Sequence, residues 1–428
     1  SAASSISGPV DVAIDRQGNA VLAWIRNGQV EVASRPSGQD WGTPQTLTAP
    51  GGAVPGTGSG AAVAVGDNGA AVVAWVAVNA GVGQRVSVAF RPPGANTFVD
   101  GGPISDPGAT TDTILGVPTV AMDASGDYAV GWRRTFDFDG AGATYDSRAY
   151  SEMRVKPVTA PMGAVKHLSP YPTTVSATFQ PPSLAMTPAG RILAAWDRFE
   201  SIQSKTYVES TEFIPGGSGF ASGTYTGTSQ LYSRAGSSFQ KPQAALDPSG
   251  GAAVLFYDSA VQVVSRASAV AGFSPPRTLS GAGAEPFYAK IGQAANGDSF
   301  VAWPTSTPGS RTYVSARRPA GKEAFEDPVA VSSLPVPANT FTSAETLSVA
   351  GDDEGNAFLA YGPTLYSFDT FTVVSGGTYV SGFDGGAPSV GIAAPASGAT
   401  GASLPFSATT TDRMSAVSVL WDFGDGTT

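Results

Sequence analysis

Short apolar runs alternate with polar turns along this chain, at a spacing that predicts β-strands rather than helices. The first clear case is the segment from Val12 to Trp24, where two apolar runs flank a polar turn and the second run ends in an aromatic ring. Six related segments follow before residue 370. We therefore predict a β-hairpin that is repeated seven times.

Each predicted hairpin carries a glycine in its turn and an aromatic ring six residues later. The glycines are Gly18, Gly69, Gly126, Gly190, Gly250, Gly297 and Gly355. The aromatic residues are Trp24, Trp75, Trp132, Trp196, Phe256, Trp303 and Tyr361. The mean spacing of about 56 residues is in the range of repeat architectures. We expect the glycines to have positive φ and the rings to be buried between neighbouring repeats.

Two further series accompany the hairpins. An aspartate ends the first strand of several repeats, where its carboxylate is expected to cap the turn. These residues are Asp15, Asp123, Asp247 and Asp352. An arginine closes the third strand, and we expect some of these arginines to pair with the aspartates. They are Arg35, Arg91, Arg154, Arg266 and Arg317.

The first repeat has room for four strands, expected at residues 10–15, 20–25, 29–35 and 43–48. Four antiparallel strands are the content of one propeller blade. We therefore predict an all-β chain in which residues 1–386 form a seven-bladed β-propeller of four-stranded antiparallel blades. Long insertions follow Trp132 and Trp196, and insertions in a repeat array are expected to be loops, often on the binding face.

The hairpin segments VAIDRQGNAVLAW, VAMDASGDYAVGW and SVAGDDEGNAFLAY resemble bacterial propeller repeats of the NHL and related kinds. The resemblance covers the hairpins of residues 10–385 and implies a fold, without implying a substrate. The chain departs from strict NHL repeats in its longer period, in the tryptophan that ends the second strand, and in Thr187 and Ala294 at turn positions.

Residues 387–428 differ in composition, and their segment WDFGDG at 421–426 resembles the signature of a PKD domain. The resemblance implies the first half of an immunoglobulin-like β-sandwich, with strands at 389–392, 404–408 and 417–423. Half a sandwich cannot bury its inner face, so we expect the remaining strands to come from a continuation of the chain or from a neighbouring chain.

Composition narrows the range of partners. The net charge is −10 with a pI near 4.6, which gives no electrostatic basis for binding nucleic acid. The chain has no cysteine, and no apolar stretch approaches the roughly 20 residues of a membrane span. An acidic, cysteine-free chain rich in Gly, Ser and Thr that starts with SAASSIS leads us to expect a secreted or cell-surface protein.

The loops that follow the second strands of blades three to five carry charged and aromatic residues that blade packing does not require. We take as candidate ligand-binding residues Arg133, Arg134, Asp197, Arg198, Glu200, Tyr257 and Asp258. Neighbouring connections carry Tyr171, Tyr232, Phe287 and Tyr288. Aromatic rings mixed with carboxylates and guanidinium groups suit sugars or acidic polymers; a solvated loop surface is the other interpretation.

One loop resembles an acidic Ca²⁺ site, with candidate ligands Asp137, Asp139 and Asp146, and no other cofactor is expected. His167 is the only histidine, so multi-histidine zinc sites are excluded and we assign no catalytic residue. The function we favour is an extracellular module that binds a glycan or a surface protein. Two alternatives stay open: a polysaccharide-active enzyme, hydrolase or lyase, with its site on the same loop face, and a structural subunit completed by strand addition at the PKD half.

Overall fold

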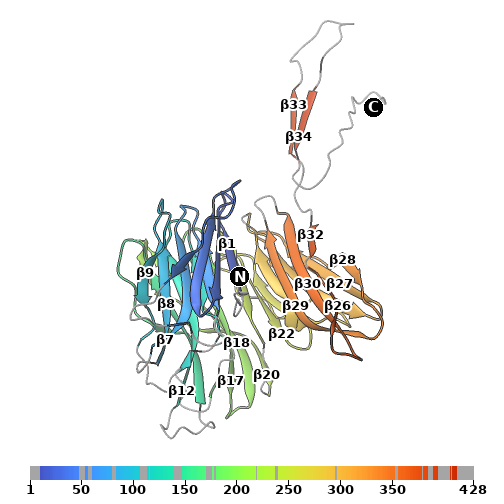
Figure 1. The fold of residues 1–428 in the computed structure, drawn as a ribbon, viewed down its shortest axis with the longest axis horizontal. Coiled ribbons are helices and arrows are strands. Elements are labelled where there is room, and N and C mark those ends of the chain that lie inside the picture. The colour runs from blue at the N-terminus through green and yellow to red at the C-terminus, as the bar shows by residue number, and fades with distance from the viewer. Residues whose placement is uncertain are drawn as a thin grey trace. The chain divides into compact units, whose positions relative to one another are not determined.

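A computed structural model of the chain shows an all-β protein (Figure 1). The structure describes residues 10–47, 54–55, 60–79, 83–106, 113–114, 116–137, 147–169, 176–177, 180–217, 219–236, 240–294, 296–351, 355–377, 379–383, 389–393, 405 and 407–411. Within these ranges, no helix has the length and apolar character needed to cross a membrane.

The described strands form seven sheets of four to six strands, which we call blades one to seven, and one two-stranded sheet. The chain divides into two compact units. The first unit contains Ser1–Phe287 and Gly321–Phe325, and the second contains Tyr288–Ala320 and Glu326–Thr428.

The first unit holds blades one to five. Blade one contains β1 (Asp11–Ile14), β2 (Ala20–Arg26), β3 (Gln29–Arg35) and β4 (Gln45–Leu47). Blade two contains β5 (Val54–Pro55), β6 (Ala61–Val65), β7 (Ala71–Asn79), β8 (Gly83–Arg91) and β9 (Val99–Pro103). Blade three contains β10 (Thr113–Ile114), β11 (Thr119–Met122), β12 (Tyr128–Asp137), β13 (Ser147–Lys156) and β14 (Lys166–His167). Blade four contains β15 (Ser176–Ala177), β16 (Ser183–Met186), β17 (Ile192–Glu200), β18 (Lys205–Gly216), β19 (Gly219–Tyr225) and β20 (Ser229–Ala235). Blade five contains β21 (Gln243–Leu246), β22 (Ala252–Tyr257), β23 (Val261–Arg266) and β24 (Arg277–Thr278).

The second unit holds blades six and seven, and a short 3-10 helix, η2 (Pro286–Tyr288), lies on the chain between blades five and six. Blade six contains β25 (Lys290–Gln293), β26 (Ser299–Thr307), β27 (Ser310–Arg318) and β28 (Val329–Pro335). Blade seven contains β29 (Thr340–Gly351), β30 (Ala357–Ser367), β31 (Val373–Gly376) and β32 (Tyr379–Phe383).

The repeated hairpin forms as predicted, with β1 antiparallel to β2 and the same arrangement in the later blades. All seven turn glycines have positive φ, from 81° at Gly69 to 100° at Gly297. The carboxylate of Asp15 accepts the backbone N–H groups of Gln17 and Asn19 at 2.9 and 2.8 Å. Capping by the described aspartates of the series is thus confirmed, whereas Asp352 lies outside the described residues.

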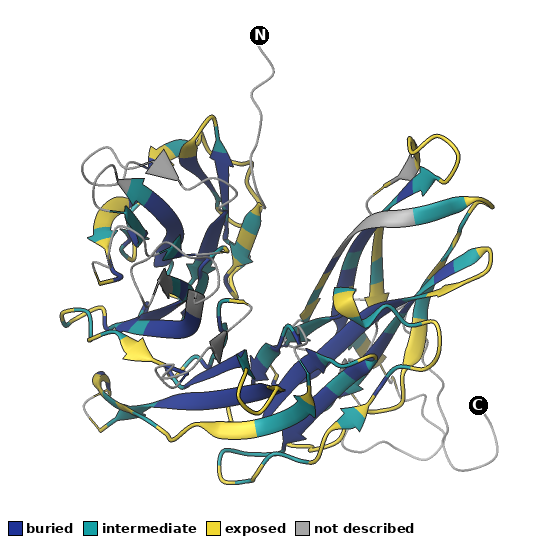
Figure 2. Cartoon of the chain, turned by 90° about the horizontal axis from the view of Figure 1, so that it is seen from below, coloured by how far each residue is buried: buried dark blue, intermediate teal, exposed yellow. Residues whose placement is uncertain are grey.

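The repeat aromatics are buried, as expected. Figure 2 shows that the buried residues lie mainly along the strands. In the first unit four of the rings pack in a core shared with the preceding blade: Trp75 with blade one, Trp132 with blade two, Trp196 with blade three and Phe256 with blade four. In the second unit, Tyr361 of blade seven stacks on Tyr313 of blade six, with ring centroids 3.8 Å apart. Because burying a side chain of this size contributes roughly 1.5–3 kcal/mol, these rings are major contributors to the association of neighbouring blades.

The glycine-rich insertion of blade four differs from the prediction, since it forms strand β19 rather than a loop. Phe220 of β19 is 5% exposed and packs on Phe213 of β18 at a ring distance of 4.8 Å. Tyr225 of β19 contacts the same Phe213 ring edge-on at 5.1 Å, so two rings hold this segment of small residues against β18. The pairing of β19 with β18 therefore makes the insertion part of the blade.

In the C-terminal segment, β33 (Ser389–Ala393) pairs with β34 (Ser407–Thr411) in an antiparallel two-stranded sheet. The WDFGDG segment lies outside the described residues. The PKD assignment, the boundary at residue 386 and the completion of a sandwich by added strands therefore stay predictions.

Candidate functional site

A buried ion pair lies beside the repeat tryptophan at the end of β17. The indole N–H of Trp196 donates to Glu209 Oε2 at 3.0 Å, and Arg198 donates to the same carboxylate through Nε at 3.1 Å and Nη2 at 2.7 Å. Glu209 lies on β18 directly opposite Trp196. Blades one and three have the same arrangement of Trp, Arg and Glu at Trp24, Arg26 and Glu31 and at Trp132, Arg134 and Glu152.

This arrangement determines the position of two predicted ligand-binding residues. Arg134 is 3% exposed and pairs with Glu152 at 3.0 Å, inside blade three. The side chain of Arg198 is 13% exposed, and it also contacts Glu200 at 3.4 Å. Arg198 and Glu200 are therefore adjacent at the end of β17, and Arg134 belongs to the interior. The glutamates were not recognised from the sequence because they occur in three of the seven repeats.

Three more predicted residues lie along a path that joins blades three, four and five. Asp197 is fully buried and accepts the backbone N–H of Gln240 at 3.1 Å. The carbonyl of Gln240 in turn accepts the backbone N–H of Tyr257 at 2.8 Å. Burial lowers the pKa of Arg133, and the negative charge of Asp197 partly offsets this effect. Asp197 and Tyr257 are thus joined through the connection between blades four and five, and Arg133 is within range of the charge of Asp197.

Asp258, one residue beyond β22, is the centre of a half-exposed polar group. Its two carboxylate oxygens accept hydrogen bonds from the hydroxyl of Tyr232 and the guanidinium of Arg234, both on β20. The side chains of Arg234 and Asp258 are 35% and 18% exposed, so the group is open to solvent. Burial and the bond to Asp258 raise the pKa of Tyr232 to about 12, which keeps its hydroxyl protonated at neutral pH.

Tyr257, the residue before Asp258 in the chain, has aromatic and cationic neighbours of its own. Tyr257 contacts Phe287 edge-on, with centroids 6.3 Å apart, and Phe287 is 45% exposed. Lys241 Nζ lies 4.6 Å from the centroid of the Phe287 ring. We call Tyr232, Arg234, Lys241, Tyr257, Asp258 and Phe287 the Asp258 cluster.

The sequence points to four of the six residues of this cluster: Tyr257 and Asp258 as candidates, and Tyr232 and Phe287 among the neighbouring aromatics. Tyr257 and Asp258 were predicted because they follow the repeat aromatic Phe256 directly. Arg234 and Lys241 were missed, since they lie on β20 and in the connection after it, where no repeat pattern marks them. The only available signal was their charge in a segment otherwise poor in charged residues.

The predicted metal ligands fall mainly outside the described residues. Asp137 ends β12, but its side chain is not described, and neither Asp139 nor Asp146 is. The described part of the chain contains no group of three His, Cys, Asp or Glu residues that could hold a metal ion. Calcium binding at this loop stays a prediction.

His167 lies on β14 and has a carboxylate neighbour. Its Nδ1 is 3.3 Å from Glu152 Oε1, its side chain is 49% exposed, and its ring packs edge-on against Tyr150 at 5.1 Å. His167 is therefore a half-exposed residue of blade three.

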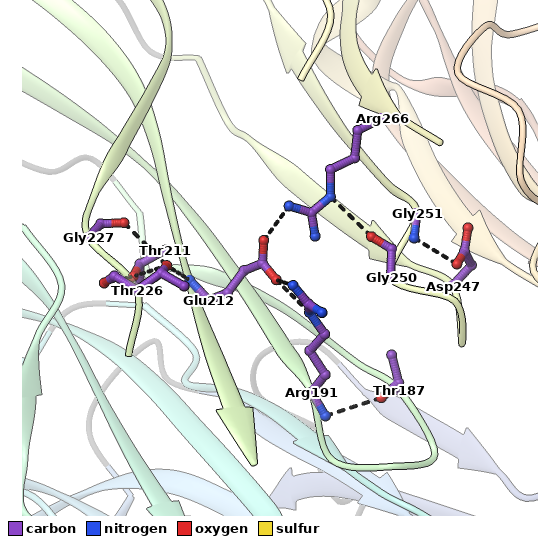
Figure 3. A network of polar contacts seen from close by, with 10 residues as sticks. All are labelled: Thr187, Arg191, Thr211, Glu212, Thr226, Gly227, Asp247, Gly250, Gly251 and Arg266. Carbon is purple, nitrogen blue, oxygen red and sulfur yellow. Dashed lines mark hydrogen bonds and ion pairs between the residues drawn. The ribbon is translucent and has the colours of Figure 1, made fainter. Parts of the chain in front are cut away.

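A second polar network joins blades four and five (Figure 3). The buried carboxylate of Glu212 accepts hydrogen bonds from Arg191, at 2.6 Å from its Nε, and from Arg266 Nη1. Arg266 Nε also donates to the carbonyl of Gly250 at 3.0 Å. Arg266, which belongs to the arginine series, therefore pairs with Glu212 on β18 rather than with a turn aspartate. The network borders a cavity of about 300 Å³ that is lined by Thr211, Thr226 and Phe273 among others.

Comparisons with known proteins give a likeness in fold. Neither a protein-family model nor a curated protein matches the sequence. Among solved structures, one described as an ulvan lyase of a new polysaccharide lyase family is 10% identical, with a TM-score of 0.51, and the match covers 89% of this chain and 94% of that one. An α-L-arabinanase from Penicillium chrysogenum is 10% identical with a TM-score of 0.41, covering 89% and 97% of the two chains. A Dyadobacter fermentans protein of unknown function is 14% identical with a TM-score of 0.39, covering 72% and 92%. The chain is thus an all-β protein of the β-propeller class, similar in fold to the ulvan lyase.

Proposed function

We propose that this chain recognises a polysaccharide and that the Asp258 cluster is its binding site. The observation that supports the proposal most strongly is that the exposed ring of Phe287 contacts Tyr257, whose chain neighbour Asp258 holds the charged group. Phe287 and Tyr257 offer apolar faces on which a sugar ring can stack, and Asp258 and Arg234 offer an acceptor and a donor for its hydroxyl groups.

Arg198 and Glu200 extend the proposed site across the neighbouring end of blade four. Arg198 is held by Glu209 on one side and by the face of the Tyr207 ring at 4.5 Å on the other, so its position is fixed before a ligand arrives. A fixed guanidinium loses little conformational entropy on binding, which favours specificity for a charged or polyhydroxylated ligand.

Binding is tested by screening the intact chain on a glycan array and measuring the affinity of the best ligand by titration calorimetry. We expect Phe287→Ala and Asp258→Asn each to weaken binding about tenfold, which corresponds to roughly 1.4 kcal/mol. Phe371→Ala is the matched control, because Phe371 is also exposed (71%) but lies in blade seven. Unchanged affinity in both cluster variants would reject the site.

Cleavage of a polysaccharide is the second candidate, and one observation favours it. A phenol, a carboxylate and a guanidinium are hydrogen-bonded in sequence at Tyr232, Asp258 and Arg234. A protonated tyrosine can donate a proton to a leaving oxygen, and a carboxylate can accept one, so the group contains the parts of an acid–base pair.

The fold likeness to an ulvan lyase selects acidic polysaccharides as the first substrates to test. New reducing ends would indicate cleavage, and the ultraviolet absorbance of an unsaturated uronate would identify an elimination. Tyr232→Phe should abolish either signal while leaving glycan binding in place. Activity that survives this substitution would exclude Tyr232 from the chemistry.

A further inference from the structure

The arginine that ends the third strand meets different partners in different blades, although its position is the same. Arg91 and Arg266 lie opposite the alanine four residues before the repeat aromatic of blades two and five. Ser34 and Glu212 lie opposite the residue three before the tryptophan of blades one and four. Arg91 with Ser34, and Arg266 with Glu212, are therefore equivalent pairs across neighbouring blades.

The two pairs differ in charge. Arg266 donates to the carboxylate of Glu212. Arg91 Nη1 instead donates to the hydroxyl of Ser34 at 2.7 Å, and its Nη2 donates to the carbonyl of Gly69 at 3.1 Å. Arg91 is 8% exposed, and its buried Nε–H finds no acceptor in the described part of the chain. Blade four supplies a carboxylate, Glu212, to the guanidinium of Arg266. Blade one supplies only the hydroxyl of Ser34 to the buried guanidinium of Arg91.

A second guanidinium borders the same space. Arg35 and Arg91 both line a cavity of about 440 Å³, and the Nε of Arg35 is likewise buried without an acceptor among the described residues. Arg35 stacks on Trp41 at 5.6 Å and Arg91 on Phe98 at 5.4 Å. Stacking holds each guanidinium by its face and leaves its in-plane N–H groups available for hydrogen bonds. Buried donors of this kind are costly to leave unsatisfied, so they favour a bound acceptor.

The nearby carboxylates already have partners. Asp15 accepts N–H groups of its own turn and the side chain of Asn19, at 2.8 to 2.9 Å. Asp67 lines the cavity and pairs with Arg16 at 3.3 Å. Burial lowers the pKa of Arg91, and the charge of Asp15 only partly opposes this effect. An external anion would therefore supply the hydrogen-bond acceptor and the negative charge that Asp15 and Asp67 do not supply to the two arginines.

We propose that the cavity between blades one and two binds an oxyanion, the carboxylate or sulfate group of a ligand, with Arg35 and Arg91 as its donors. Guanidinium groups recognise such groups through paired N–H bonds. The amide side chains of Gln17 and Asn96 also line the cavity and can bond to the neutral remainder of the ligand. This site is separate from the Asp258 cluster and does not depend on the proposed function.

The test uses the intact chain and three probes: sodium glucuronate, sodium sulfate, and glucose as a neutral probe, with sodium chloride matching the ionic strength. We expect glucuronate or sulfate to bind in calorimetry and to raise the midpoint of thermal unfolding above the glucose and chloride values. Binding of one anion and not of the other would assign the group as a uronate or a sulfate ester. Equal effects of glucuronate, sulfate and glucose would overturn the proposal.

The decisive variant is Ser34→Glu, which copies the Glu212 arrangement into blade one. We expect it to raise the unfolding midpoint without ligand and to weaken anion binding at least tenfold. Ser37→Glu adds the same charge outside the cavity and should keep the wild-type affinity. Arg91→Gln is the second variant, and it should also lose anion binding. It provides the test if Ser34→Glu does not fold. Anion effects of equal size in the wild type and in the substituted cavity would show that the effect is a general one of salt, and would overturn the site.

Discussion

Glu212 shows how much single polar residues contribute to the contacts between blades. The residue is 7% exposed, and its carboxylate accepts hydrogen bonds from both Arg191 and Arg266. Both arginines therefore depend on Glu212 for charge compensation. Removing one member of a buried ion pair leaves its partners charged and desolvated, which costs more than the pair itself contributes.

We therefore expect Glu212→Ala to lower the free energy of unfolding by about 3–5 kcal/mol. Arg16→Ala is the control, because the side chain of Arg16 is 51% exposed in its pair with Asp67 and exposed pairs contribute at most about 1 kcal/mol. Urea unfolding curves measure both changes. Equal losses in the two variants would show that burial of Glu212 has no special role.

Asp11 provides a prediction with a definite pH dependence. Burial raises its pKa from the usual 3.8, although Val63 N–H at 2.8 Å and its neighbour Val12 donate to the carboxylate. A carboxyl group with a raised pKa in the folded state binds its proton more tightly there, so its contribution to stability falls as pH rises through the folded pKa.

Asp11→Asn keeps an oxygen acceptor for Val63 and removes the buried charge. We expect this variant to unfold at a higher temperature than the wild type at pH 7, with the gap closing below pH 3.8, where the wild-type group is protonated in both states. Thermal unfolding across this pH range measures the gap. A constant difference at every pH would contradict the raised pKa.

For single residues, the sequence predicts the structural role of those that occur in every repeat and does not predict the role of those that occur in only some repeats. The buried ring and the turn glycine occur in every repeat, so their roles could be inferred from position alone. Glu152 and Glu209 could not be found in this way, because their function depends on the strand register that places them opposite a tryptophan.

The hairpin is the element on which each blade is built, and its turn tolerates few residues. Gly126 has a φ of +90°, and a Cβ at this position would lie 2.9 Å from the Cβ of Ala70. We expect Gly126→Ala to cost about 1–3 kcal/mol because it combines left-handed strain with this clash. Gly281→Ala, which meets no atom within 4 Å and has no positive φ, should change stability by less than about 0.5 kcal/mol. Calorimetric unfolding of both variants checks the difference, and similar values would contradict the argument.

Among elements, the sequence predicts the four strands of blade one closely but not the extra strands of blades two to four. β3 has the predicted bounds, because its alternation and its flanking turns are complete. The sequence predicts a loop where β19 forms, since three of its seven residues are Gly or Ser and its pairing with β18 cannot be inferred from the sequence. Pairing to a neighbour, rather than intrinsic preference, fixes such strands.

For the whole molecule, repeats with a fixed offset were enough to predict an all-β fold of the propeller class. The Asp258 cluster could be predicted only in part, because it draws on β20, β22 and two connections that lie far apart in sequence. Its residues share no pattern with one another, and Asp258 meets Tyr232 and Arg234 only because blade five packs on blade four.

A crystal structure of the intact chain with the tightest-binding oligosaccharide is the most direct test of this account. We predict a sugar ring stacked on Phe287 or Tyr257, with hydroxyl or acidic groups hydrogen-bonded to Arg234 or Asp258. An oligosaccharide bound away from all six residues of the cluster, with the cluster unchanged, would contradict it.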